Sequence, residues 1–177
     1  MAGRGVHFAI SEEEWRALTG LSSDEAKVEY VSEVIEERYF DSDRLSSFMV
    51  ETDKAWYALH CLLAERTTAQ VDANLADGVQ PLVNAILGGE RVLEDEEAAG
   101  YWIVARRGEV IDAIAAALQA IDYAEFDRRY ALYAKEIGER LEDDEFDDYC
   151  WHWFQELRDF YVRSAGAGRV VIFTVDV

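Results

Sequence analysis

The sequence has only two cysteines, Cys61 and Cys150, and no long apolar run. Two cysteines exclude a disulfide framework and favour reduced thiols. The apolar clusters AIAAALQAI and VVIFTVDV are far shorter than the roughly 20 residues of a membrane helix. The opening stretch MAGRGVHFAI also lacks the apolar run of a signal peptide. We therefore predict a cytoplasmic protein with no membrane partner.

Basic residues are scarce. The chain has 17 Lys and Arg against 37 Asp and Glu, a net charge of −20 at pH 7. A surface this negative repels phosphate backbones and anionic lipid head groups, which excludes direct nucleic-acid binding. Two interpretations remain open: the charge keeps the chain in solution, or it attracts a basic protein partner.

Sequence motifs of common enzymes are also lacking. The chain has no Gly-x-Ser-x-Gly elbow, no phosphate-binding Gly-Lys-Ser/Thr loop and no dinucleotide-binding Gly-x-Gly-x-x-Gly. Neither cysteine lies in a nucleophile motif. We expect no catalytic residues and no cofactor, and the sequence leans against an enzyme.

What is present suits a folded core. Half of the residues are hydrophobic and 12% are aromatic, which is enough for one domain over residues 1–177. Residues 5–10 resemble a strand, and Ser11 with Glu14 forms a capping box for a short helix. Ser22 with Glu25 repeats the pattern before a helix that reaches about Phe40. Residues 41–50 fit either a helical turn or an ordered loop.

The rest of the chain alternates helices and strands. Thr52 is the expected N-cap of a helix through residue 63, and Pro81 is expected to open a helical turn. Further elements are predicted: a brief strand near ERV, an exposed acidic loop at 94–100, a strand at 101–106, helices over 110–121, 126–137 and 146–160, and a strand in the last nine residues. RVVIFTVDV is apolar on both alternating faces, so it predicts an interior strand. The sum is an α+β domain with a small mixed or antiparallel sheet and about six surrounding helices.

The stretch DKAWYALHCLL, residues 53–63, concentrates chemically versatile side chains. On a helix, Trp56, Leu59, His60 and Leu63 share one face, with Asp53 at its mouth. This face is either core packing or the wall of a ligand site. The site hypothesis adds the ILGGE turn, and its tentative cleft consists of Asp53, Trp56, His60, Gly88, Gly89 and Glu90. The packing alternative makes the glycines a turn that needs positive φ.

Metal binding is weighed on two segments. His60 and Cys61 are adjacent, and Cys150 and His152 are close, but neighbouring helical residues point about 100° apart and cannot easily share an ion. The acidic run 142–148 lacks the spacing of an EF-hand loop. We expect no metal, with buried cysteines and acidic runs at 94–97 and 142–148 that face solvent.

The segments DKAWYALHCLL, PLVNAILGGE, VIDAIAAAL and FYVRSAGAGRVVIF follow a strand and SEEEW in an order that resembles the DUF1877, or YfbM-like, family. Residues 66–80 match nothing in this pattern. The resemblance implies a small bacterial cytoplasmic protein with an α+β fold and no established activity. It marks the six residues of the tentative cleft as positions that match family motifs and assigns them no role.

Two classes of function stay open. The first is an interaction domain that binds a basic protein, such as a toxin or regulator, in the manner of immunity proteins. The alternative is a small-molecule or enzymatic site, with Trp56 as a recognition platform, His60 as a polar contact and Glu90 as a carboxylate. We also expect either a monomer or a homodimer through the aromatic C-terminal helix, which carries Trp151, Trp153, Phe154, Phe160 and Tyr161.

Overall fold

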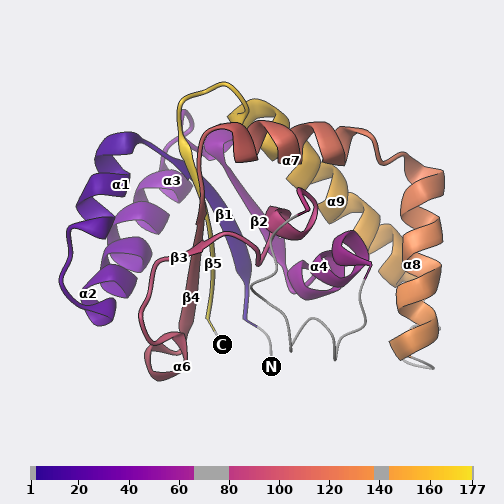
Figure 1. Ribbon diagram of the computed structural model, residues 1–177, viewed down its shortest axis with the longest axis horizontal. Helices are drawn as coiled ribbons and strands as arrows, with labels where there is room; N and C mark the ends of the chain where they lie inside the picture. The colour runs from indigo at the N-terminus through magenta and orange to yellow at the C-terminus, as the bar shows by residue number, and fades with distance from the viewer. Residues whose placement is uncertain (1–2, 66–79, 138–143, 177) are drawn as a thin grey trace.

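The computed structural model describes residues 3–65, 80–137 and 144–176. Its centre is a five-stranded antiparallel sheet with the strand order β2-β1-β5-β4-β3. The strands are β1 Gly5–Ile10, β2 Met49–Asp53, β3 Glu90–Arg91, β4 Tyr101–Arg106 and β5 Val170–Asp176. Helices cover both faces of this sheet (Figure 1). The predicted α+β fold is therefore confirmed. Of the two predicted kinds of sheet, mixed and antiparallel, the sheet is antiparallel.

The C-terminal strand β5 lies in the middle of the sheet. It pairs with β1, where Phe8 faces Ile172, and with β4, where Val104 faces Phe173. Its residues from Val170 to Val175 are buried on both faces. A strand in this position needs apolar side chains at successive positions, as RVVIFTVDV supplies. The prediction of an interior strand is confirmed.

One face of the sheet is covered by the helices that follow β1 directly. They are α1 Glu12–Thr19, α2 Asp24–Glu29, the π-helical η1 Tyr30–Glu36 and α3 Glu37–Asp41. The Ser11–Glu14 capping box that starts α1 is confirmed. Val31, Ile35 and Tyr39 are fully buried and pack in one cluster with side chains of β1 and β5. Burial at positions four apart is the stripe that the sequence predicts for a helix through about Phe40.

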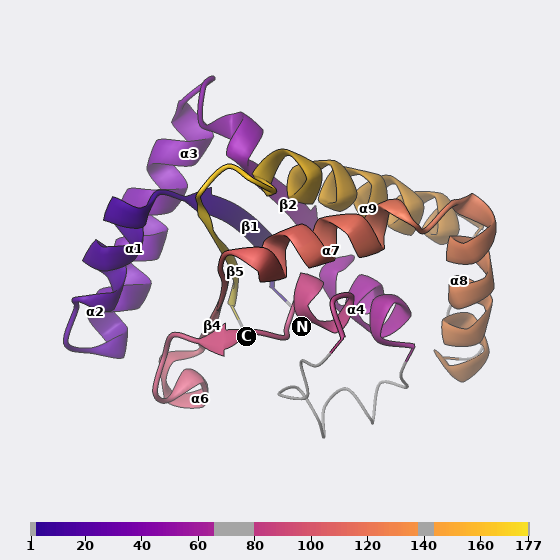
Figure 2. The ribbon, with the colours of Figure 1, turned by 45° about the horizontal axis from the view of Figure 1, so that its top comes forward.

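The opposite face is covered by later helices. They are α4 Trp56–Ala64, the 3₁₀ turn η3 Val83–Ala85, α7 Glu109–Gln119 and α9 Asp144–Ser164, and α8 Tyr123–Ile137 packs against α4 and α9. Both views show α7 and α9 lying side by side along this face (Figures 1 and 2). Phe154, Phe160 and Tyr161 of α9 are fully buried in the domain's own core, while Trp151 and Trp153 are partly buried. A homodimer through α9 stays a prediction.

Two predictions about helix starts are wrong. The N-cap of α2 is Ser23, not Ser22, because the Ser23 hydroxyl accepts a hydrogen bond from the Ala26 N–H at 3.2 Å. Thr52 does not cap α4, whose N-cap is Ala55. The Thr52 hydroxyl instead donates to the Gly5 carbonyl oxygen at 3.1 Å. That bond holds Thr52 in strand β2.

Two irregular segments also differ in detail from the prediction. Residues 41–50 contain the 3₁₀ turn η2 Ser46–Phe48 and then the start of β2, a strand that the sequence analysis misses. The acidic stretch 94–100 contains a short helix, α6 Glu96–Ala99. The turn that follows Pro81 is 3₁₀, and Glu90–Arg91 forms the expected brief strand. The predictions on residues 66–79 and 142–143 fall outside the described residues.

Candidate functional site

Asp53 closes strand β2 and faces helix α9. Its backbone is left-handed, with φ of 45°, and a carboxylate oxygen accepts a hydrogen bond from the Tyr149 hydroxyl at 2.7 Å. Burial and this carboxylate together raise the pKa of Tyr149 to about 12. The pair therefore consists of a neutral phenol and its acceptor at neutral pH, and it joins the end of β2 to α9.

Trp56 is a core residue. Its indole is 3% exposed and lies near the rings of Trp102 and Phe173, with centroid distances of 6.1 and 5.7 Å. The indole N–H donates to the Gly3 carbonyl oxygen at 2.9 Å. A Cβ on Gly5 would lie 2.8 Å from the Trp56 ring, so β1 needs glycine there. The indole is thus enclosed by packing, and its polar atom is satisfied.

His60 lies in the middle of α4 and is 2% exposed. It is surrounded along the helix by the buried residues Leu59, Leu62 and Leu63. Cys61 and Cys150 are buried in the same core cluster. Among the residues that the structure describes, no group of three or more His, Cys, Asp or Glu side chains is arranged to hold a metal ion.

The two glycines of ILGGE are explained by close backbone approaches. Gly89 has φ of 132°, and a Cβ there would lie 2.6 Å from the Ala105 carbonyl oxygen. A Cβ on Gly88 would lie 2.4 Å from the Asn84 side-chain oxygen. Positive φ is present at Gly89 alone of the two. The two glycines therefore allow the chain to turn tightly into β3. This agrees with the packing interpretation of the motif.

The six residues of the tentative cleft do not meet on one surface. Asp53 ends β2 and Glu90 begins β3, and these are the two opposite edges of the sheet. Four strand spacings of about 4.8 Å separate such edges by roughly 19 Å. Trp56 and His60 are buried, whereas Glu90 is exposed. None of the three cavities described below is lined by any of the six.

A buried polar cluster that has no signature in the sequence lies around the turn η3. The Ala85 carbonyl oxygen accepts hydrogen bonds from His7 Nε2 at 2.9 Å and from the Tyr161 hydroxyl at 2.7 Å. Because a carbonyl only accepts, Nε2 of His7 carries the proton. Burial and the charge of Arg106 lower the pKa of His7 to about 3, although the bond to Ala85 opposes the shift. His7 is therefore neutral at neutral pH.

Arg106 completes this cluster from strand β4. Its guanidinium is 2% exposed and donates to the carbonyl oxygens of Asn84 and Ile86, and to that of Val104 at 3.1 Å. Burial lowers the pKa of Arg106. The cluster thus fastens η3 to β1, β4 and α9 through three consecutive carbonyl groups, which is a structural role. Its partners come from four distant segments, so no local signal identifies it.

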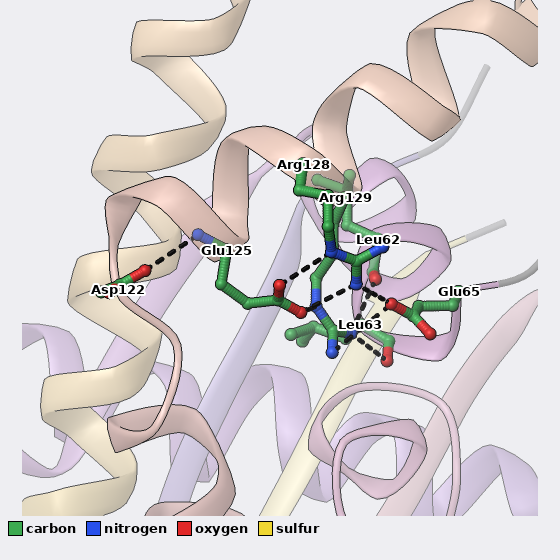
Figure 3. A network of polar contacts seen from close by, with 7 residues as sticks. All are labelled: Leu62, Leu63, Glu65, Asp122, Glu125, Arg128 and Arg129. Atoms are coloured by element: carbon green, nitrogen blue, oxygen red, sulfur yellow. Dashed lines mark hydrogen bonds and ion pairs between the residues drawn. The ribbon is translucent and has the colours of Figure 1, made fainter.

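A second polar network joins α4 to α8 (Figure 3). Glu125 accepts from Arg128 at 2.8 Å and from Arg129 at 2.7 Å, and these two bonds lower its pKa to about 2. Arg128 also pairs with Glu65. Arg129 reaches the Leu62 and Leu63 carbonyl oxygens at 3.3 Å each. These carbonyls lie at the C-terminal end of α4, where the helix dipole favours a cation.

Three surface cavities are lined by residues that the structure describes. One, of about 710 Å³, lies where α2 and η1 meet α6. A second, of about 440 Å³, lies along β2. A third, of about 380 Å³, lies around the α7 N-terminus and the glycines after α9. Among the described residues, none of the helices is long and apolar enough to cross a membrane.

A family model matches this chain over residues 1–174, and its description is a domain of unknown function, DUF1877. The chain belongs to the DUF1877 family. The crystal structure of YfbM from Escherichia coli, a protein of unknown function, is similar to it with a TM-score of 0.65. The identity is 18%, and the match covers 99% of each chain. No curated protein matches. The predicted resemblance is confirmed, and the DUF1877 fold is shared over the full length of both chains.

Proposed function

We propose that this DUF1877 protein is a cytoplasmic interaction domain that binds a basic protein partner, as an immunity protein or a regulator does. The observation that carries the proposal is the cavity of about 710 Å³ where α2 and η1 meet α6, which we call the acidic groove. It is lined by five carboxylates, those of Asp24, Glu25, Glu29, Glu33 and Asp95.

The acidic groove has the chemistry of a site for lysine or arginine side chains. Its remaining lining is Val28, Ser32, Ala98 and Ala99. Small apolar side chains beside carboxylates accommodate both the aliphatic stem and the charged head of a basic residue. The protein's net charge of −20 adds long-range attraction, which speeds association and makes it sensitive to salt.

The acidic groove is held in shape by Asp24. One of its carboxylate oxygens accepts hydrogen bonds from the Glu94 and Asp95 N–H groups, each at 2.8 Å. The bond from Asp95 is the main cause that lowers the pKa of Asp24. Lys27, the nearby cation, pairs with Asp24 at 3.1 Å and donates to the Val92 carbonyl oxygen. An Asp95 carboxylate oxygen accepts from the Ala98 N–H at 3.0 Å as the N-cap of α6, and Glu25, Glu29 and Glu33 supply the other carboxylates that line the acidic groove.

Affinity capture from cell lysate tests the proposal. The wild-type protein is expected to retain a basic protein at low salt and to release it at about 1 M salt, where the Debye length is about 3 Å. The variant Glu33→Lys is expected to retain less, because it reverses a charge inside the acidic groove. Asp127→Lys is the matched control, since Asp127 is an exposed residue of α8. Equal retention by all three proteins, or no retained protein, would overturn the proposal.

A further inference from the structure

Strand β2 forms one edge of the sheet and, among the described residues, pairs with β1 alone. A cavity of about 440 Å³, which we call the edge groove, is lined by the consecutive residues Met49, Val50 and Glu51. Successive side chains of a strand point to opposite faces. A cavity that contacts three in a row therefore lies along the free edge of the strand, beside its backbone.

The edge groove has one wall on each face of the sheet. Phe40 and Ser46 contribute one wall, and His152, Trp153 and Glu156 of α9 contribute the other. Figure 2 shows β2 between α3 and α9. Phe40 is 42% exposed, and Trp153 is partly buried. The groove thus combines aromatic walls, a strand backbone and the carboxylates of Glu51 and Glu156.

We propose that the edge groove binds an extended basic segment of a partner protein, which pairs with Met49–Glu51 as an added strand. An edge strand presents unpaired N–H and C=O groups, and strand addition uses them for affinity. A lysine or arginine side chain of the segment meets Glu156, and an apolar side chain of the segment packs on Trp153. The expectation that the partner segment is basic rests on the proposed function.

The Phe40 and Glu51 side of the edge groove already holds a cation of this chain, that of Arg4. The Arg4 guanidinium carbon lies 5.2 Å from the centroid of the Phe40 ring, and Arg4 pairs with Glu51 at 3.5 Å and Glu36 at 3.8 Å. A guanidinium over an aromatic face beside a carboxylate is a favourable arrangement. Arg4 therefore already supplies the cation for Phe40 and Glu51, and the carboxylate of Glu156 on the other wall is the one that meets a basic side chain of the segment.

The length of the paired segment is limited by the strand itself. The register with β1 shifts by a bulge after Glu51, and the Thr52 carbonyl oxygen accepts from the Ala55 N–H at 3.0 Å. A β-bulge in an edge strand hinders its pairing with a further strand. Pairing is thus confined to about three residues of β2, which predicts weak binding by an isolated peptide. A second copy of this chain is the wrong occupant, because each copy carries a charge of −20.

The test uses the peptide acetyl-Lys-Val-Lys-Val-Lys-amide and the intact protein. Binding is expected to shift the amide resonances of Met49–Glu51 and to slow hydrogen exchange there. Glu156→Lys is expected to weaken binding about fivefold, the upper range for an exposed charge pair. Glu33→Lys, the same charge reversal in the acidic groove, is expected to leave the shifts at Met49–Glu51 in place.

Two N-methylated peptides test the strand pairing directly. One carries methyl groups on both valines and the other on the central lysine, with unchanged charge. Alternate N–H groups of a strand face its neighbour, so one of the two peptides is expected to lose the shifts at Met49–Glu51. If both N-methylated peptides still shift the amide resonances of Met49–Glu51, the proposal of strand addition is overturned. Shifts confined to the acidic groove would overturn the edge proposal and leave the proposed function standing. Concentration-dependent protection of β2 without peptide would assign the edge to a second copy.

Discussion

His7 and Tyr161 donate to the same carbonyl oxygen, that of Ala85, from opposite ends of the chain. His7 belongs to β1 and Tyr161 to α9, and both side chains are completely buried. Arg106 donates hydrogen bonds to the carbonyl oxygens of the residues on either side of Ala85, which are Asn84 and Ile86. The turn η3 is thus held on three consecutive carbonyls by neutral or cationic donors, and its stability depends on their protonation.

The first prediction follows from the pKa of about 3 for His7, against an ordinary value of 6.5. Below pH 6.5 the unfolded chain binds a proton at this histidine and the folded chain does not. The free energy of unfolding therefore falls as the pH falls, by up to about 1.4 kcal/mol per pH unit from this group, until about pH 3. Urea unfolding of the wild type and of His7→Asn across this range is the measurement. The variant is expected to lose this part of the slope.

The control for this experiment is Tyr161→Phe. It removes one hydrogen bond to Ala85 at a cost of about 1 kcal/mol but leaves His7 to titrate. Its curve is expected to lie below that of the wild type and parallel to it. If His7→Asn instead keeps the full slope, His7 is not the group responsible.

The second prediction concerns Gly89→Ala. The new Cβ would lie 2.6 Å from the Ala105 carbonyl oxygen, on a backbone with φ of 132°. The loss in free energy of unfolding is expected to exceed about 1 kcal/mol, because conformational strain and a backbone clash add. Gly166→Ala is the matched comparison: φ is 68°, and no atom lies within 4 Å of the added Cβ. Equal losses for the two variants in thermal unfolding would show that the approach to Ala105 is unimportant.

The third prediction separates two neighbouring arginines of α8. Arg129 is 13% exposed and reaches the Leu62 and Leu63 carbonyl oxygens, whereas Arg128 is 49% exposed and pairs with the carboxylates of Glu65 and Glu125. Arg129→Met is therefore expected to lower the melting temperature more than Arg128→Met. The effect of Arg128→Met is expected to vanish at high salt, since screening removes exposed ion pairs. A larger loss for Arg128→Met would contradict this order.

The parts of the fold that the sequence predicts well are those specified by neighbouring residues. The Ser11–Glu14 box, strand Tyr101–Arg106 and strand β5 depend on local capping, β-branched content and continuous apolar character. Strand β2 is missed because its sequence, MVETD, has only two β-branched residues and ends on an aspartate. What makes it a strand is pairing with β1, some forty residues earlier, together with the bond from Thr52 to Gly5.

The candidate site is predicted less well for the same reason. Helical spacing places Trp56 and His60 on one side of α4, but it does not reveal whether that side faces a cavity or the core. The structure buries both residues. Conversely, the acidic groove joins Glu29 and Glu33 to Asp95, and the edge groove joins Glu51 to Glu156. Neither juxtaposition has a local sequence signature, because each depends on tertiary contacts.

The central position of β5 has a consequence for the order of folding during synthesis. β1 is synthesised before β2, which follows within some fifty residues, but the other ladder of β1 needs Val170–Thr174 of β5. Before β5 is synthesised, one edge of β1 is unpaired, and β4 also lacks its pairing with β5. Pairings between distant segments close slowly and expose strand edges meanwhile. The sheet of the nascent chain is therefore complete only after β5 has been synthesised, and the acidic residues of the chain help to keep the incomplete intermediate from aggregating.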